Sequence, residues 1–148
     1  MRIEQTFRIA RPPETVFDYI TNPANLAAWQ TSKTRVEAET DGPPRQGYRV
    51  REWTKPPVGR EFEQLVEFTE FDRPHRLHVH IVEGPYPVDG TWTLTADQPG
   101  TSSIHFVAEG KMRGLMRLLE PIGSRLMRRQ FAAYHENLRT NVEALNRN

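Results

Sequence analysis

The sequence predicts an α+β fold in which a curved antiparallel sheet of seven strands wraps around one long C-terminal helix. One observation is a helical pattern over residues 124–145, where apolar and aromatic residues recur at steps of three and four. The other is the series of about seven segments with period-two alternation that precedes it. Such a sheet is about 33 Å wide at about 4.8 Å per strand, whereas one helix is only about 10–12 Å across. The helix cannot fill a sheet that wraps around it, so we expect a hollow lined by side chains.

Alternation of apolar and polar residues marks each predicted strand. In the fourth, for example, Val66 and Phe68 alternate with Glu67 and Thr69, the pattern of a strand with one face in water. Short turns separate the strands and favour antiparallel neighbours. The strands are predicted at 2–10, 34–40, 48–54 and 60–71, and around the alternating apolar positions of 77–81, 92–94 and 104–108.

Prolines bound the predicted helices. A Pro-Pro pair at 12–13 opens a helix, because proline is tolerated in the first turn. An Asn-Pro pair at 22–23 ends that helix and caps a second, short one over 23–29. A further helical turn over 113–120 is set apart from the terminal helix by Pro121, which can begin a helix but not continue one. The predicted order is therefore strand, two helices, six strands and terminal helix.

Composition excludes several classes of function. The 148 residues are most simply one domain, 1–148. A net charge of +1 does not favour a nucleic-acid partner. The chain has no cysteine, so it has no disulfides, thiolate metal sites or cysteine nucleophiles. There is no apolar signal segment at the N-terminus and no nucleotide-binding or zinc-protease motif, so we expect a cytoplasmic protein without a cofactor.

Strand parity and the helical stripe select the side chains that should face the hollow. Pockets of this kind are mostly apolar with a few placed polar groups. The predicted ligand-binding residues are Tyr48, Val50, Glu52, Phe62, Gln64, Val66, Val79, Ile81, Trp92, Phe106, Met127 and Phe131.

Glu52 is the candidate catalytic residue. A carboxyl group in an apolar hollow can act as a general acid or base. Alternatively, the alternation slips near Pro56 and Glu52 meets solvent or an arginine. Gln64 and Gln5 also point inward by parity, where either could orient a ligand or hydrogen-bond a neighbouring strand.

Histidines are weaker candidates. His78 and His80 share one strand face, and such a pair can bind a metal ion, but no third ligand lies nearby in sequence. Charge pairing with Glu63 and Glu67 on the outer sheet face is the favoured interpretation, so no metal site is predicted. His135 either forms an acid–base pair with Tyr134 or lies on the flank of the helix.

A basic amphipathic segment leads into the terminal helix. Lys111, Arg113 and Arg117 lie close in sequence to Leu118 and Leu119. Such a segment is usually a solvated face, and the alternative is transient contact with the surface of an anionic membrane.

Five segments of the sequence resemble a known superfamily, in the same order along the chain. The chain resembles the START-like, or SRPBCC, superfamily of the Bet v 1-like helix-grip fold, and within it the polyketide cyclase/dehydrase and lipid-transport group. The resemblance implies the helix-grip fold and a small hydrophobic ligand, but no defined catalytic signature is matched. The segments are residues 10–20 (ARPPETVFDYI), 22–29 (NPANLAAW), 46–48 (QGY), 70–77 (EFDRPHRL) and 100–101 (GT).

Three functions remain open on the sequence. The first is binding or transport of a small hydrophobic molecule, such as a lipid, polyketide or isoprenoid-like compound, between the sheet and the terminal helix. The second is a cyclase or dehydratase in which Glu52 moves protons. The third is a non-catalytic module that binds another protein, which a solid core with an exposed apolar patch would favour.

Overall fold

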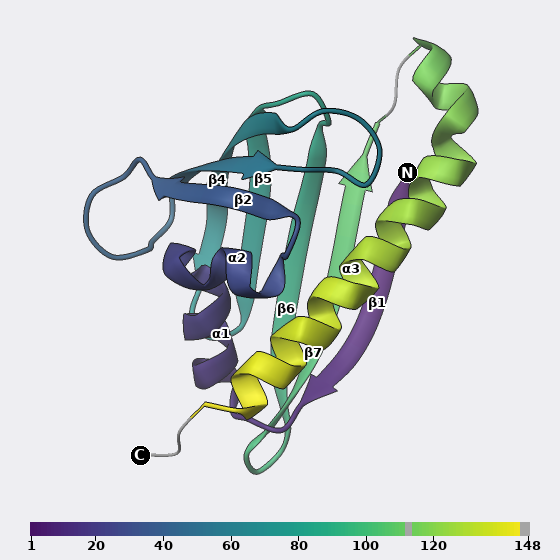
Figure 1. Ribbon diagram of the computed structural model, residues 1–148. Helices are drawn as coiled ribbons and strands as arrows, with labels where there is room; N and C mark the ends of the chain where they lie inside the picture. Colours follow the sequence, from purple (N-terminus) through teal and green to yellow (C-terminus); the bar gives the residue numbers. More distant parts are fainter. Residues whose placement is uncertain (112–113, 146–148) are drawn as a thin grey trace.

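The computed structural model describes residues 1–111 and 114–145 and shows the predicted α+β architecture (Figure 1). A long helix, α3, crosses the inner side of a curved sheet, and two shorter helices lie beside it. The strands are β1 (Arg2–Ile9), β2 (Lys33–Ala38), β3 (Arg49–Thr54), β4 (Phe62–Asp72), β5 (Arg76–Glu83), β6 (Val88–Gln98) and β7 (Thr101–Gly110). The helices are α1 (Pro13–Thr21), η1 (Pro23–Asn25), α2 (Leu26–Trp29), η2 (Gly114–Leu119) and α3 (Glu120–Glu143), η1 and η2 being 3₁₀ helices.

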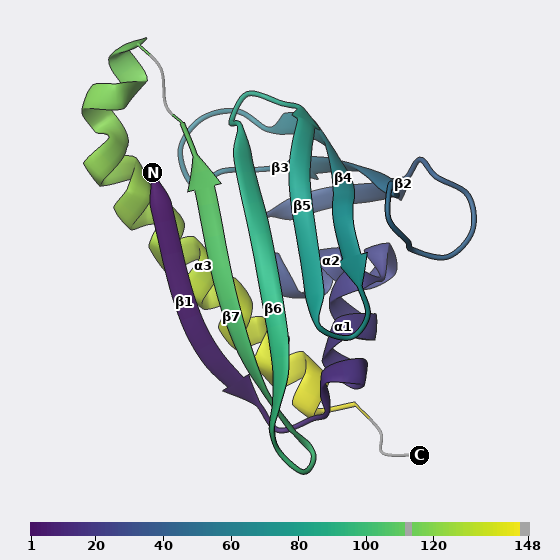
Figure 2. The ribbon, with the colours of Figure 1, turned by 180° about the vertical axis from the view of Figure 1, so that it is seen from behind.

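The seven strands form one antiparallel sheet in the order β1-β7-β6-β5-β4-β3-β2. Six of them form a meander, and β1 joins it beside β7, so that the first and last strands in the sequence are neighbours (Figure 2). Ile3 lies opposite Ala108 and Ile9 opposite Ser102 across this pair. Register shifts interrupt β2 against β3 and β4 against β5, and such bulges bend a sheet.

The ends of α3 follow from local chemistry. Pro121 occupies the first turn of α3, where proline is tolerated, and η2 stops at Leu119, as the predicted break requires. The helix ends at Glu143 rather than at Leu145, which is 39% exposed. An Arg11 guanidinium N–H donates to the carbonyl of Glu143 at 2.7 Å. A cation near the carbonyls of a helix C-terminus is favourable, so Arg11 ties this end of α3 to the loop after β1.

The buried face of α3 carries a polar network in the core. The indole N–H of Trp92 donates to Nε2 of His135 at 3.2 Å, and Nδ1 of His135 lies 2.8 Å from Oε1 of Gln5. Because an indole N–H can only donate, the proton of the neutral imidazole is on Nδ1 and is donated to Gln5. Gln5 in turn donates to the carbonyl of Arg128 at 2.9 Å. His135 thus links β6 and β1 to α3 through its hydrogen bonds, and Gln5 links β1 to α3.

Acid should destabilise the fold through His135. Burial lowers the pKa of His135 from its ordinary 6.5 to about 3, so between these values the unfolded chain binds a proton that the folded protein does not. Stability is lost as the pH falls through this window, by about 1.4 kcal/mol per pH unit. The variant His135→Gln has no group that titrates at this position. Between pH 6.5 and about 4.5, the free energy of unfolding of the native protein should therefore fall by roughly 2–3 kcal/mol more than that of the variant. Denaturant unfolding of both proteins measures this, and parallel pH profiles would contradict it.

Candidate functional site

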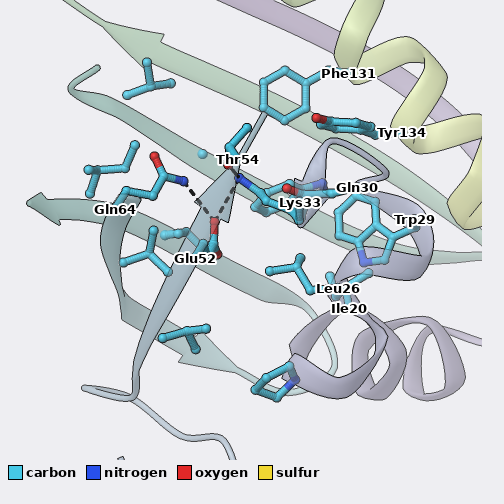
Figure 3. Close-up of a pocket in the computed structure, with 18 of the residues that line it drawn as sticks. Ile20, Leu26, Trp29, Gln30, Lys33, Glu52, Thr54, Gln64, Phe131 and Tyr134 are labelled. Carbon is cyan, nitrogen blue, oxygen red and sulfur yellow. Dashed lines mark hydrogen bonds and ion pairs between the residues drawn. The ribbon is translucent and has the colours of Figure 1, made fainter. Parts of the chain in front are cut away.

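A cavity of about 160 Å³ lies between the concave face of the sheet and the helices. This space exceeds what one water molecule needs by about tenfold. Its walls are mostly apolar, and it is bordered by residues of α1, η1, α2, β2, β3, β4, β5, β6 and α3 (Figure 3). The lining residues are Ile20, Thr21, Pro23, Leu26, Trp29, Gln30, Lys33, Val50, Glu52, Thr54, Phe62, Gln64, Val66, Phe68, Leu77, Val79, Ile81, Tyr86, Val88, Gly90, Trp92, Met127, Gln130, Phe131 and Tyr134.

All of the predicted ligand-binding residues except Tyr48 and Phe106 border this cavity. Tyr48 is buried beside Phe68, with their ring centroids 5.7 Å apart. Phe106 lies beneath two lining residues, with ring centroids 4.8 Å from Trp92 and 4.6 Å from Phe131. Both side chains belong to the packed layer behind the wall. That the other residues bind a ligand stays a prediction.

Glu52 points into the cavity, so the alternation of β3 persists through Thr54. Its residue is 6% exposed. The side-chain amide of Gln64 donates to Oε1 of Glu52 at 2.9 Å across the β3–β4 pair. The same Oε1 lies 2.9 Å from Nζ of Lys33, whose side chain is buried to the same extent as that of Glu52. The ion-pair partner of Glu52 is therefore a buried lysine inside the cavity and not an arginine.

Lys33 reaches the cavity because β2 is irregular at its start. The register of β2 against β3 shifts between Lys33 and Arg35, so that Lys33 lies opposite Thr54. Without the shift, simple alternation would place Lys33 on the outer face with Arg35 and Glu37. Nζ of Lys33 also donates to Oγ1 of Thr54 at 2.9 Å. Bulges often turn a side chain toward a site, but no feature of the sequence showed this one.

The helices supply polar groups to the opposite wall. The hydroxyl of Tyr134 bonds to that of Ser32. Burial raises the pKa of Tyr134 above its ordinary value, and the nearby charge of Glu52 raises it further. Gln30 and Trp29 are buried and border the cavity, and the indole N–H of Trp29 has no partner within the described residues. Sequence reasoning predicted the two short helices but not where they lie against the sheet, so Trp29 and Gln30 were not among the predicted ligand-binding residues.

Three of the histidines outside the core pair with acids on the outer face. Nδ1 of His80 lies 2.7 Å from Asp89, Nε2 of His78 lies 3.6 Å from the same carboxylate, and His105 pairs with Glu4 at 2.7 Å. No group of three potential metal ligands occurs among the residues that the structure describes. The predicted charge pairing thus involves Asp89 instead of the glutamates of β4.

Comparison with models of known protein families identifies the family of this chain. Residues 1–143 match the model of a family described as polyketide cyclase/dehydrase and lipid transport. The chain belongs to this family. The description covers both catalysis and transport, so membership confirms the resemblance in the sequence without deciding between these functions. No curated protein matches the sequence.

Solved structures show the same fold at low sequence identity. TTHA0849 of Thermus thermophilus is 19% identical with a TM-score of 0.81, covering 97% of this chain and 98% of its own. A START superfamily protein of Mycobacterium smegmatis is 14% identical with a TM-score of 0.79, covering 98% and 99%. The Zhui aromatase/cyclase of Streptomyces sp. R1128 is 14% identical with a TM-score of 0.76, covering 97% and 93%. These comparisons confirm the helix-grip fold.

The basic segment is described only in part. Arg113 lies outside the described residues, whereas Lys111 and Arg117 are exposed. Among the described helices, none combines the length and the apolar character needed to cross a bilayer.

Proposed function

We propose that the protein binds and carries a small hydrophobic molecule in the cavity between the sheet and α3. The observation that carries this proposal is the cavity itself, which is walled by apolar side chains in a protein that otherwise packs a dense core. An apolar cavity of about 150 Å³ can hold a benzene ring in a protein of another fold. Burial of an apolar ligand contributes about 25 cal/mol per Å² removed from water, less the cost of association. Family membership supports the same ligand class.

Filling the cavity should abolish binding. Val79 lines the cavity from β5, so Val79→Phe places a ring in the space that the ligand needs. Val107→Phe is the matched control, since Val107 borders a groove on the outer face of the same sheet. We expect N-phenyl-1-naphthylamine to gain fluorescence with the native protein and with Val107→Phe, and its affinity for Val79→Phe to fall at least about tenfold. Equal affinities for the three proteins would show that the probe binds elsewhere.

A cyclase or dehydratase activity is the second candidate. The inward position of Glu52 favours it. One carboxylate oxygen of Glu52 contacts both Lys33 and Gln64, and the other oxygen is left for a substrate. Cyclisation of a polyketone begins with removal of a proton from carbon next to a carbonyl, and Glu52 is the base that the cavity offers. The hydroxyl of Tyr134 is engaged by Ser32. Glu52 is therefore the residue on which this candidate depends.

Proton exchange tests this candidate directly. If Glu52 is a base, the native protein should accelerate deuterium uptake at the methyl group of 2-acetylnaphthalene in D₂O, and Glu52→Gln should lower the rate about 100-fold or more. NMR loss of the methyl signal measures the rate. Exchange no faster than in buffer, or unchanged in the variant, would exclude Glu52 as a base on such ketones.

Contact with an anionic membrane is a further part of the proposed function. Leu118, Leu119, Ile122 and Leu126 are each more than half exposed, and the last three recur at helical spacing on the side of α3 away from the core. Exposed arginines flank them on η2 and α3. We name these four residues the outer apolar face. Basic charge around exposed leucine and isoleucine fits an anionic lipid surface. Met127, next to Leu126, lines the cavity, so a docked membrane would lie close to the ligand.

Vesicle binding tests the outer apolar face. The double variant Ile122→Ser/Leu126→Ser should sediment with phosphatidylserine vesicles at least about tenfold more weakly than the native protein, because it loses two insertable side chains. Leu145→Ser, just beyond the other end of α3, is the matched control and should bind like the native protein. Added salt should weaken binding. Failure of the native protein to bind, or equal binding by the double variant, would refute membrane contact through this face.

A further inference from the structure

The polar end of the cavity has hydrogen-bonding capacity to spare. Oε1 of Glu52 accepts from Gln64 and pairs with Lys33, whereas Oε2 of Glu52 has no partner among the described residues (Figure 3). The amide of Gln64 donates through Nε2, and its carbonyl oxygen Oε1 is likewise without a partner in the described part of the chain. The ammonium of Lys33 has three N–H donors. One donates to Oγ1 of Thr54 at 2.9 Å, and the ammonium also forms an ion pair with Oε1 of Glu52. Two acceptors and at least one donor therefore remain.

These spare acceptors are accessible from within the cavity. Over residues 1–111 and 114–145, the fully enclosed side-chain nitrogen and oxygen atoms without a partner are Nε of Arg11 and Nε1 of Trp29. Neither Oε2 of Glu52 nor Oε1 of Gln64 is among them, so each keeps some accessible surface although its residue is buried. Both residues line the cavity. A molecule in the cavity can therefore reach these two acceptors.

We propose that the ligand is an uncharged, largely apolar molecule with a hydroxyl group, an alcohol or a phenol, which donates its proton to Glu52 or Gln64. This inference rests on the proposed binding function and narrows its ligand class. A hydroxyl both donates and accepts, so it can satisfy a spare acceptor while it takes the spare N–H of Lys33. The rest of the molecule lies against the apolar walls.

Other polar groups fit this end of the cavity less well. A ketone or an ether only accepts, so it would leave Oε2 of Glu52 desolvated without a donor, which is costly. A carboxylate or phosphate only accepts and would also lie beside the charge of Glu52. Lys33 does not favour binding of an anion, because the carboxylate of Glu52 at 2.9 Å already balances its charge. A pure hydrocarbon would leave every spare group unpaired.

Three matched probes test the inference. 2-Naphthol donates a proton, 2-methoxynaphthalene has the same ring system without the donor, and 2-naphthoate carries a charge. Binding is followed by the indole N–H signals of Trp29 and Trp92, which border the cavity, in ¹H–¹⁵N NMR titrations. We expect 2-naphthol to bind at least about tenfold more tightly than either of the others, since a hydrogen bond to a charged acceptor contributes more than a neutral one.

Variants assign the preference to the proposed atoms. Gln64→Met keeps the ion pair, removes one acceptor, and should reduce the preference for 2-naphthol over the methyl ether several-fold. Glu52→Gln leaves Lys33 without its counter-ion, and should both reduce that preference and make 2-naphthoate the tightest of the three. Glu63→Gln, the same type of change on the outer face of β4 where Glu63 pairs with Arg51, should bind all three probes as the native protein does.

The outcomes separate this inference from the function on which it rests. Binding of all three probes with equal affinity, or tightest binding of 2-naphthoate by the native protein, refutes the hydroxyl preference and leaves a hydrophobic carrier in place. Absence of any signal change with all three probes refutes both. If Glu52→Gln does not fold, Gln64→Met still decides whether the preference arises at this end of the cavity.

Discussion

The interior of this protein is governed by a mismatch of width between one helix and a seven-stranded sheet. The core stripe of α3, which includes Tyr134, Leu138 and Val142, packs tightly along its length. A helix about 10–12 Å across cannot cover the inner faces of all seven strands, and the short helices α1 and α2 cover part of what remains. The space left over lies over β3 to β6 and is the cavity. The hollow is thus a consequence of the architecture, and the side chains determine what it holds.

Stability alone does not explain an ion pair between Lys33 and Glu52 in such a place. Desolvation of two charges often cancels their attraction, and apolar residues of similar volume can be as stable. The neighbouring inward positions are occupied by two buried valines, Val50 and Val66, so apolar side chains fit this part of the sheet. A buried pair that leaves acceptors open to the cavity instead gives the apolar hollow one polar end. Such an end orients a ligand, which apolar walls alone do not do.

The sequence predicted the parts of this structure that depend on local periodicity. Alternation along β3 and β4 placed Val50, Glu52 and Gln64 inward, and all three border the cavity. It missed Lys33, which precedes the predicted strand 34–40. The register shift that turns this side chain inward is set by pairing with β3 and leaves no mark on the sequence of β2. Parity also cannot tell the wall of a cavity from the layer behind it, which is why Phe106 lies beneath Trp92 and Phe131.

Pairing over long distances along the chain was equally beyond sequence reasoning. The contact of β1 with β7 joins residues about a hundred positions apart. The network from Trp92 through His135 to Gln5 depends on that pairing, so His135 was indistinguishable from a residue on the helix flank. Helix α3 also carries a second apolar face, with Ile122 and Leu126, beside its core stripe. Adjacent residues, Leu126 outside and Met127 inside, connect the two faces. Any partner that moves the first turns of α3 must therefore also move a wall of the cavity.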